Sequence, residues 1–230
     1  AQKAVVERFA ERLKRAGTLV LCLDFDGVLA DSLDYLTDIA RTAQREIGEG
    51  RVPVPGDFSR INPLTFASFA YQIGVSRGRV EDFGRAVMEI QSRSSRVPRL
   101  FTGAKAHLES WCARYEVAVV TASHGDYAAQ TLKRADAHLG GISILGAETG
   151  LSKAARIAAY LEKLGRPRAN ACLVGDAVSD ISEARKTGIP AVSVDWGFQD
   201  AGYLASRHPD YLVSSFEELD GVLRELEVGA

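Results

Sequence analysis

The chain has 230 residues, of which 46% are hydrophobic and 25% are charged. These proportions are typical of a soluble globular protein, and the length suits one large domain with room for a smaller inserted module. The formal net charge of −2 shows no basic excess, so no nucleic-acid partner is expected. No apolar run approaches the ~20 residues that a membrane span needs, so no membrane association is expected.

The first segment in chain order, residues 1–17, is predicted to be an amphipathic helix that packs against the domain. Val5, Phe9 and Leu13 fall on one face of it, and the segment lacks the pattern of a secretory signal. The chain has three cysteines and no C-x-x-C pair, which argues against a disulfide framework or a zinc site. We therefore expect a cytoplasmic protein.

Short apolar runs alternate with helical segments over most of the chain. The runs cover residues 18–23, 117–120, 142–145, 171–174, 191–194 and 211–213. Helices are predicted at residues 105–115, 126–138, 153–164, 179–187 and 216–226. Apolar runs without alternation indicate strands that are covered on both faces. The order of strands and helices therefore predicts an α/β fold with a Rossmann-like, doubly wound parallel sheet.

One interval, residues 32–98, contains no convincing buried strand. Its pattern predicts a loop at residues 51–63 and helices at residues 33–47, 64–73 and 80–92. Helical periodicity over such a stretch favours a small inserted helical domain over a long loop. The predicted division is a core domain of residues 1–31 and 99–230 and a helical domain of residues 32–98.

Polar residues follow four of the apolar runs, at the point where each predicted strand ends. In the order of the runs they are Asp24 and Asp26, then Thr121, Ala122 and Ser123, then Lys153 after a short loop, and finally Asp176 and Asp180. Ligands of parallel sheets bind outside the carboxyl ends of the strands. Each segment alone could be an ordinary turn or helix cap, but their order favours one shared site.

The chemistry of these residues points to phosphoryl transfer. Four carboxylates at one sheet edge would repel one another unless a cation or protons neutralised them. Oxygen ligands favour Mg²⁺, which usually pairs with a substrate phosphate, and a lysine and a hydroxyl suit the remaining phosphate oxygens. One carboxylate can then attack phosphorus, while a second protonates the leaving oxygen and later activates water.

These segments resemble the motifs of the haloacid dehalogenase (HAD) superfamily. Asp24-Phe25-Asp26-Gly27-Val28-Leu29 is similar to its first motif and Gly175-Asp176-x-x-x-Asp180 to its fourth. Thr121 resembles the second motif, and Lys153 resembles the third. The helical insertion lies where the superfamily places a C1-type cap, so the chain is most similar to the phosphoglycolate phosphatase and β-phosphoglucomutase branch.

The resemblance implies a role for each motif residue. Asp24 would be the nucleophile and Asp26 the general acid/base, while Lys153 would stabilise the charge on Asp24 and on the phosphoryl group. Lys153 is followed by alanine and not by the proline common in this branch, which leaves Lys133 as the alternative. The implied phosphate-binding residues are Thr121, Ala122 and Ser123. The implied Mg²⁺ ligands are Asp24, the main-chain carbonyl of Asp26, Asp176 and Asp180.

Substrate choice is expected to come from the cap and its closure over the site. Arg60 and Asn62 are the best candidates for contact with substrate, since they lie in a loop bounded by prolines. An arginine could pair with a substrate carboxylate or a second phosphate, although solvation at the surface is the more frequent state of any single arginine. The other cap arginines considered are Arg77, Arg79, Arg93 and Arg96.

The expected function is Mg²⁺-dependent hydrolysis of a small phosphorylated metabolite, either phosphoglycolate-like or a sugar phosphate, through an aspartyl-phosphate. A phosphosugar mutase with the same four motifs is the alternative. A third possibility is a phospho-dependent regulatory module such as a receiver domain, against which the cap insertion and the second acid at Asp26 argue. The sequence leaves the choice between monomer and homodimer open.

Overall fold

The computed structural model describes residues 18–137 and 140–228, so the helix predicted at residues 1–17 lies outside the described part. In that part, six strands form one parallel sheet in the order β5-β4-β1-β6-β7-β8. The strands are β1 (Val20–Leu23), β4 (Glu116–Val120), β5 (Ile142–Leu145), β6 (Ala171–Gly175), β7 (Ala191–Val194) and β8 (Tyr211–Val213). The predicted fold class is confirmed, and each strand coincides with a predicted apolar run.

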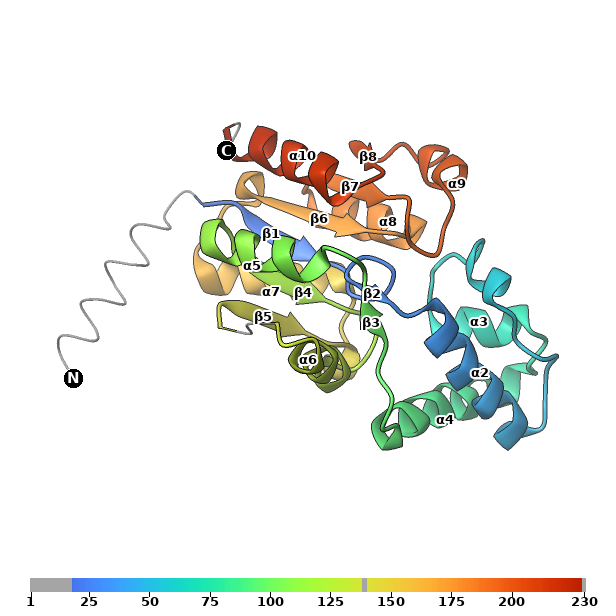
Figure 1. Ribbon diagram of the computed structural model, residues 1–230. Helices are drawn as coiled ribbons and strands as arrows, with labels where there is room; N and C mark the ends of the chain where they lie inside the picture. The colour runs from blue at the N-terminus through green and yellow to red at the C-terminus, as the bar shows by residue number, and fades with distance from the viewer. Residues whose placement is uncertain (1–17, 138–139, 229–230) are drawn as a thin grey trace.

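Helices cover both faces of the sheet (Figure 1). They are α5 (Ala104–Arg114), α6 (Gly125–Arg134), α7 (Lys153–Leu164), α8 (Val178–Thr187), α9 (Ala201–Ala205) and α10 (Phe216–Val228). Leu21 and Leu23 of β1 pack in one cluster with α5, α6 and α10, while Val20 and Cys22 pack in another with α7 and α8. Strand β1 is therefore buried on both faces at the centre of the sheet, which fixes the position of the residues that follow it.

A separate group of helices lies beyond the carboxyl ends of the strands, where the arrowheads point in Figure 1. It contains α2 (Leu33–Ile47), η1 (Pro55–Phe58), α3 (Phe66–Gln72), η2 (Arg77–Arg79) and α4 (Val80–Arg93). Helix α4 packs against both α2 and α3, and the rings of Phe69 and Phe83 are fully buried between them. We call this group the cap, and its exact division from the core at residues 31/32 and 98/99 stays a prediction.

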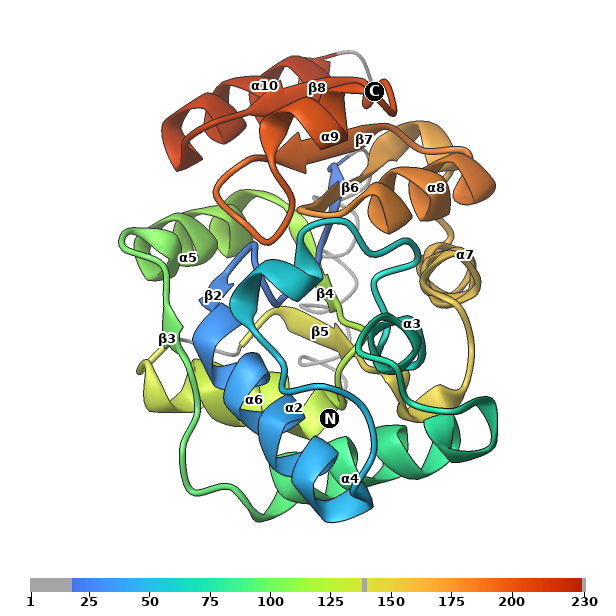
Figure 2. The same cartoon turned by 90° about the vertical axis from the view of Figure 1, so that its right-hand side faces the viewer.

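A small antiparallel pair joins the cap to the core. Strand β2 (Ala30–Asp31) pairs with β3 (Arg99–Leu100) where the chain leaves the core and where it returns, as Figure 2 shows beside α2. The N–H of Phe101 also donates to the carbonyl of Leu29 at 2.9 Å. The two crossings are therefore held side by side. Strands of this length produce no periodicity, so no sequence pattern predicted them.

Smaller differences from the predicted elements concern segment ends and short turns. Helix α6 ends at Arg134, before a turn in which Asp136 adopts a φ of 54°, and residues 138–139 lie outside the described part. Helix α9 was not predicted, nor were the short 3₁₀ turns η1, η2, η3 (Ala147–Thr149) and η4 (Arg168–Asn170). None of these changes moves a predicted site residue away from its strand end.

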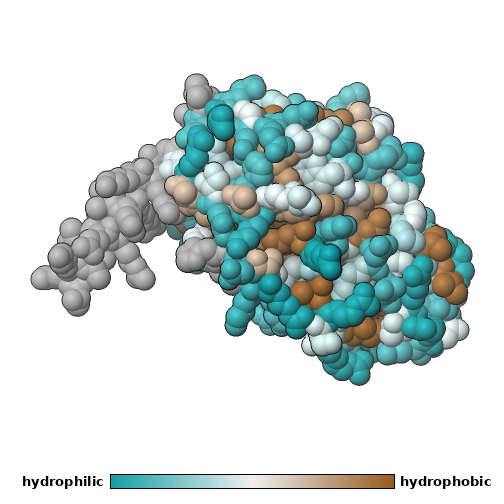
Figure 3. Space-filling model, in the orientation of Figure 1, coloured by the Kyte–Doolittle hydropathy of each residue, from teal (hydrophilic) through white to brown (hydrophobic). Residues whose placement is uncertain are grey.

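The described surface carries exposed hydrophobic side chains only as scattered residues. Hydrophobic residues form small patches separated by hydrophilic ones on the face shown in Figure 3. The exposed large hydrophobic residues are Val52, Val54, Tyr71, Leu151 and Leu212, and scattered residues of this kind are normal on monomers. No helix among residues 18–137 and 140–228 is long and apolar enough to cross a membrane. Cys22 and Cys172 are buried and form no disulfide.

Candidate active site

The ends of β1, β4 and β6 bring the predicted site residues to one edge of the sheet. Asp24 directly follows β1, and its N–H still donates to the carbonyl of Val174 in β6 at 2.8 Å. Thr121 follows β4, and its N–H donates to Leu145 of β5 at 3.2 Å. Helix α7 begins at Lys153, after Ser152 has capped it by accepting a hydrogen bond from the N–H of Ala155. Backbone pairing therefore sets the places of the first three motifs.

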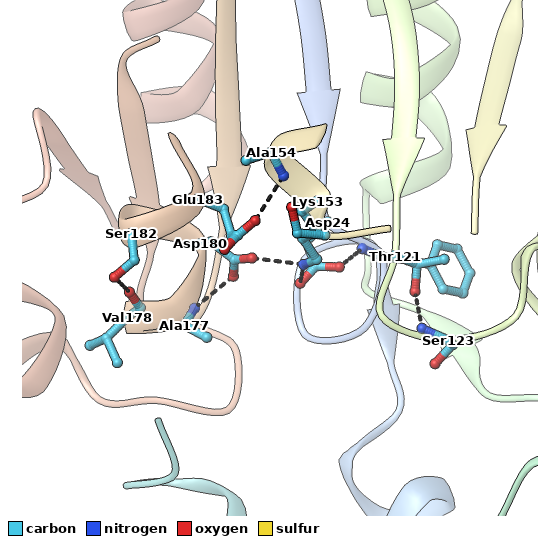
Figure 4. A network of polar contacts seen from close by, with 12 residues as sticks. Asp24, Thr121, Ser123, Lys153, Ala154, Ala177, Val178, Asp180, Ser182 and Glu183 are labelled. Carbon is cyan, nitrogen blue, oxygen red and sulfur yellow. Dashed lines mark hydrogen bonds and ion pairs between the residues drawn. The ribbon is translucent and has the colours of Figure 1, made fainter. Parts of the chain in front are cut away.

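Lys153 lies between two carboxylates (Figure 4). Its Nζ is 2.6 Å from Oδ2 of Asp24 and 2.7 Å from Oδ1 of Asp180, and all three side chains are almost completely buried. Burial disfavours the charged form of Lys153, but Asp180 and Asp24 outweigh it and raise the pKa of the ammonium above its usual value. Lys153 is therefore a cation. Lys133 is exposed on α6, so the geometry favours Lys153 as the lysine of the site.

Three buried aspartates form an acidic cluster around this lysine. Oxygen atoms of Asp24, Asp176 and Asp180 all lie within 4.8 Å of one another. Oδ2 of Asp176 accepts a hydrogen bond from the N–H of Phe198 at 2.6 Å, while its Oδ1 is buried without a hydrogen-bond partner. An unpartnered buried carboxylate oxygen is costly, and oxygen donors suit Mg²⁺. The residues present therefore fit a bound divalent cation.

Burial raises the pKa values of the three aspartates in the acidic cluster. Burial, together with the neighbouring carboxylates of Asp24 and Asp180, raises the pKa of Asp176 well above its usual value. Burial likewise raises the pKa of Asp180 to about 6, although Lys153 opposes the shift. The pKa of Asp24 is raised by burial and opposed by Lys153 as well. The single positive charge of Lys153 does not balance the negative charges of three carboxylates, so a further cation would stabilise the ionised cluster.

Gly27 allows the loop after β1 to approach this cluster. Its φ is +78°, a conformation that favours glycine. A Cβ built on Gly27 would lie 2.0 Å from Oδ2 of Asp176. A side chain here would therefore displace the Asp176 carboxylate or the loop itself.

Asp26 lies beside the cluster and is held by hydroxyl groups. Ser123 Oγ donates to its Oδ2 at 2.8 Å, and Tyr127 OH donates to its Oδ1 at 3.0 Å. Burial raises the pKa of Asp26, while the nearby hydroxyls of Ser32, Ser123 and Tyr127 oppose the shift. The sequence had suggested Ser123 as a phosphate-binding residue and had not suggested Tyr127, which lies 101 residues away from Asp26 in the chain.

The loop after β4 is braced by an arginine that the sequence analysis missed. Thr121 is fully buried, and its Oγ1 accepts a hydrogen bond from the N–H of Ser123 at 2.9 Å. Arg156 donates to the carbonyl of Thr121 at 2.8 Å and also to that of Leu145. Arg156 lies three positions after Lys153, on the same face of α7. This spacing was the one feature of the sequence that could have pointed to Arg156.

The site opens into a cavity of about 320 Å³ between core and cap. Six predicted site residues line it, namely Asp24, Asp26, Ala122, Ser123, Lys153 and Asp180. Thr121 and Asp176 lie behind them and are not part of the lining. Arg60 and Asn62 are exposed outside the cavity. The side chain of Arg60 pairs with Asp200 at 3.0 Å, so the structure does not bring these two cap residues to the site.

The fold and the site geometry agree with the family of hydrolases that the sequence matches. Residues 21–194 match the family described as haloacid dehalogenase-like hydrolase. Because the match covers more than half of the chain, the chain belongs to this family. The resemblance seen in the four motifs and the expectation that the protein is a hydrolase are confirmed. The receiver-domain alternative is therefore not retained.

The chain is similar to proteins from several bacteria. A phosphoglycolate phosphatase of Synechococcus elongatus is 24% identical over 200 residues, which are 86% of this chain and 94% of that protein. Pyrophosphatase PpaX of Oceanobacillus iheyensis is 30% identical over 59 residues, or 26% of this chain and 28% of that protein. Among solved structures, a haloacid dehalogenase-like hydrolase from Streptococcus pneumoniae has a TM-score of 0.74 at 22% identity, covering 90% of this chain and 98% of its own. At this identity the solved structure supports the fold alone.

Proposed function

We propose that this protein is a Mg²⁺-dependent phosphatase that hydrolyses a small phosphate monoester through an aspartyl-phosphate on Asp24. The observation that carries the proposal is the side chain of Asp24, which lines the cavity while Lys153 holds one of its oxygens at 2.6 Å. The other oxygen accepts a hydrogen bond from the N–H of Phe25 at 2.7 Å. The carboxylate is thus fixed in orientation and faces the place where a substrate would enter.

In the first step, a carboxylate oxygen of Asp24 attacks phosphorus, and the bond from phosphorus to the ester oxygen breaks. Asp26, protonated at the start, gives its proton to the departing oxygen, so that a neutral alcohol leaves. Lys153 stabilises the negative charge that develops on the phosphoryl oxygens. Ala122 and Ser123 line the same cavity; the main-chain N–H of Ala122 would hold the phosphoryl group, while the Ser123 hydroxyl donates to Asp26.

In the second step, Asp26 takes a proton from a water molecule, and the water oxygen attacks phosphorus. The bond from phosphorus to the Asp24 oxygen breaks, which releases inorganic phosphate and restores both carboxyl groups. Ser123 and Tyr127 hold the two oxygens of Asp26 throughout. Both steps therefore need Asp26 in one position.

The proposed Mg²⁺ ligands are Asp24, the main-chain carbonyl of Asp26, Asp176 and Asp180. A bound Mg²⁺ would neutralise the acidic cluster and polarise the phosphoryl oxygens. Support comes from the buried oxygen of Asp176 that lacks a partner and from the mutual distances within the cluster. We also propose that the protein acts on a free metabolite in the cytoplasm, in line with the buried Cys22 and Cys172, which form no disulfide.

The proposal predicts that Asp24→Asn abolishes phosphatase activity. Purified protein with Mg²⁺ should release phosphate from an aryl phosphate, and kcat should fall roughly 10³-fold or more in the variant, because an amide is a poor nucleophile. Asp31→Asn is the matched control, since Asp31 is exposed in β2 and lies outside the cavity. Equal phosphate release by wild type and Asp24→Asn would refute the assignment. A burst of product without turnover, relieved by a sugar bisphosphate, would indicate the mutase instead.

A further inference from the structure

The cap contributes an apolar wall to the cavity. Its lining residues are Leu36, Phe58, Pro63, Leu64, Thr65 and Phe66. The single polar side chain among them, that of Thr65, caps helix α3 by accepting a hydrogen bond from the N–H of Ser68, and it also donates to the Ser68 hydroxyl. The core adds Phe198 on the same side, whose ring lies 5.6 Å from that of Phe58. On the cap side, a substrate's organic group would therefore meet carbon, since the other polar lining residues, including Ser152, Ser179 and Glu183, belong to the core.

Cationic side chains of the cap point elsewhere. Arg51 pairs with Asp57, Arg79 with Asp82, and Arg96 with Asp38, as Arg60 does with Asp200. No arginine of the described cap lines the cavity. The cations that do line it are Lys153 and Arg156, which lie on the phosphate side, against two carboxylates and two main-chain carbonyls respectively.

Resting on the proposed phosphatase function, we infer that the substrate is a phosphate monoester whose organic group is uncharged and apolar. A carboxylate or a second phosphate at the cap wall would lose its water without gaining a positive partner, which is strongly unfavourable. A sugar would likewise leave the hydroxyls that face the cap wall without partners. Phosphoglycolate, pyrophosphate and hexose phosphates are therefore disfavoured, and short branched alkyl or aryl phosphates are favoured. The cavity volume of about 320 Å³ is at the lower end for small-molecule sites.

A matched pair of substrates tests this inference on the unaltered protein. Isobutyl phosphate and phosphoglycolate have organic groups with the same number of heavy atoms and differ mainly in the carboxylate. We expect kcat/KM for isobutyl phosphate to exceed that for phosphoglycolate by roughly tenfold or more. Equal or greater turnover of phosphoglycolate would overturn the inference and leave the phosphatase proposal intact. Failure to hydrolyse either ester or an aryl phosphate would instead refute the phosphatase proposal.

A charge placed on the cap wall should change this preference. Leu64 is half-buried and lines the cavity, so Leu64→Arg should raise kcat/KM for phosphoglycolate relative to isobutyl phosphate by roughly tenfold. Val54→Arg adds the same charge at an exposed cap position outside the cavity and should leave the ratio unchanged. Thermal unfolding of both variants shows whether they fold. A folded Leu64→Arg protein with the wild-type ratio would contradict the role of this wall.

Discussion

The carboxyl group of Asp26 is held more firmly than a surface acid could be. Each oxygen accepts a hydrogen bond from a different hydroxyl, one from Ser123 and one from Tyr127. The Tyr127 ring stacks on Tyr35 of the cap with centroids 5.7 Å apart, and its edge meets Phe25 of the core at 5.8 Å. Tyr127 therefore links the acid/base of the proposed reaction to both parts of the molecule.

Tyr127→Phe should lower kcat by roughly tenfold with little change in KM. The reason is that the variant removes one of the two hydrogen bonds that orient the Asp26 carboxyl, worth about 0.5–1.5 kcal/mol while Asp26 is protonated and about 1.5–3 kcal/mol once it is charged. The phenylalanine ring can keep the stacking contacts, so little stability should be lost. Steady-state kinetics with an aryl phosphate measures the effect.

Tyr160→Phe is the matched control for this experiment. Like Tyr127, Tyr160 has a hydroxyl that forms hydrogen bonds in a partly buried setting. Its partners are Glu116 and Ser143, at 2.9 Å each, but Tyr160 does not line the cavity. Its removal should leave kcat unchanged. If both variants had the same kcat, a positioning role for Tyr127 would be wrong.

At the scale of elements, Arg156 connects the start of α7 to the ends of two strands. Its guanidinium donates to the carbonyls of Thr121 and Leu145, which follow and end β4 and β5 respectively. The residue is only 6% exposed, so these bonds lie mostly out of water. The helix that carries Lys153 is thereby held against the loop that carries Ala122 and Ser123.

Arg156→Met should destabilise the fold and impair the site together. The buried Thr121 carbonyl would lose its donor, while the Leu145 carbonyl would keep only the N–H of Thr121, and we expect the free energy of unfolding to fall by about 1–3 kcal/mol. The measurement is chemical denaturation, with kcat/KM recorded in parallel. Lys163→Met, at an exposed position near the end of the same helix, should change neither quantity. An Arg156→Met protein with wild-type stability would show that the strand ends do not depend on this contact.

The sequence predicted the elements and the motif residues well because both depend on local signals. Strands such as β6 are continuous apolar runs, and Asp176 follows one directly. By contrast, Arg156 and Tyr127 act through contacts with segments far away in the chain, which no local pattern records. Arg60 lies in a loop and could bind an anionic group of the substrate. In the folded chain, however, its partner is the carboxylate of Asp200, which is distant in the sequence. The apolar wall of the cap could not be predicted either, because its residues come together only in the folded chain.

At the scale of the whole molecule, the acidic cluster should make the metal-free protein less stable as pH rises. Burial raises the pKa of Asp180 above its usual value to about 6, and it raises the pKa values of Asp24 and Asp176 as well. A raised pKa means that the folded state binds the proton more tightly than the unfolded chain. Stability is therefore greatest below pH 4 as far as these groups are concerned, and it falls as pH rises through about 6.

Mg²⁺ should reverse this loss, because it binds the ionised carboxylates of the folded state alone. At pH 7.5 and a concentration of about 100 times the Kd, Mg²⁺ should raise Tm by roughly 5–10 °C, whereas at pH 4.5, where protons compete for the same oxygens, the rise should be much smaller. Asp176→Asn removes one buried charge, so it should raise the Tm of the metal-free protein at pH 7.5 and abolish most of the Mg²⁺ effect.

Scanning calorimetry with EDTA or Mg²⁺ at both pH values measures all of these shifts. A Mg²⁺-induced shift of equal size in wild type and Asp176→Asn would mean that the ion binds elsewhere, and the acidic cluster would then need another source of positive charge.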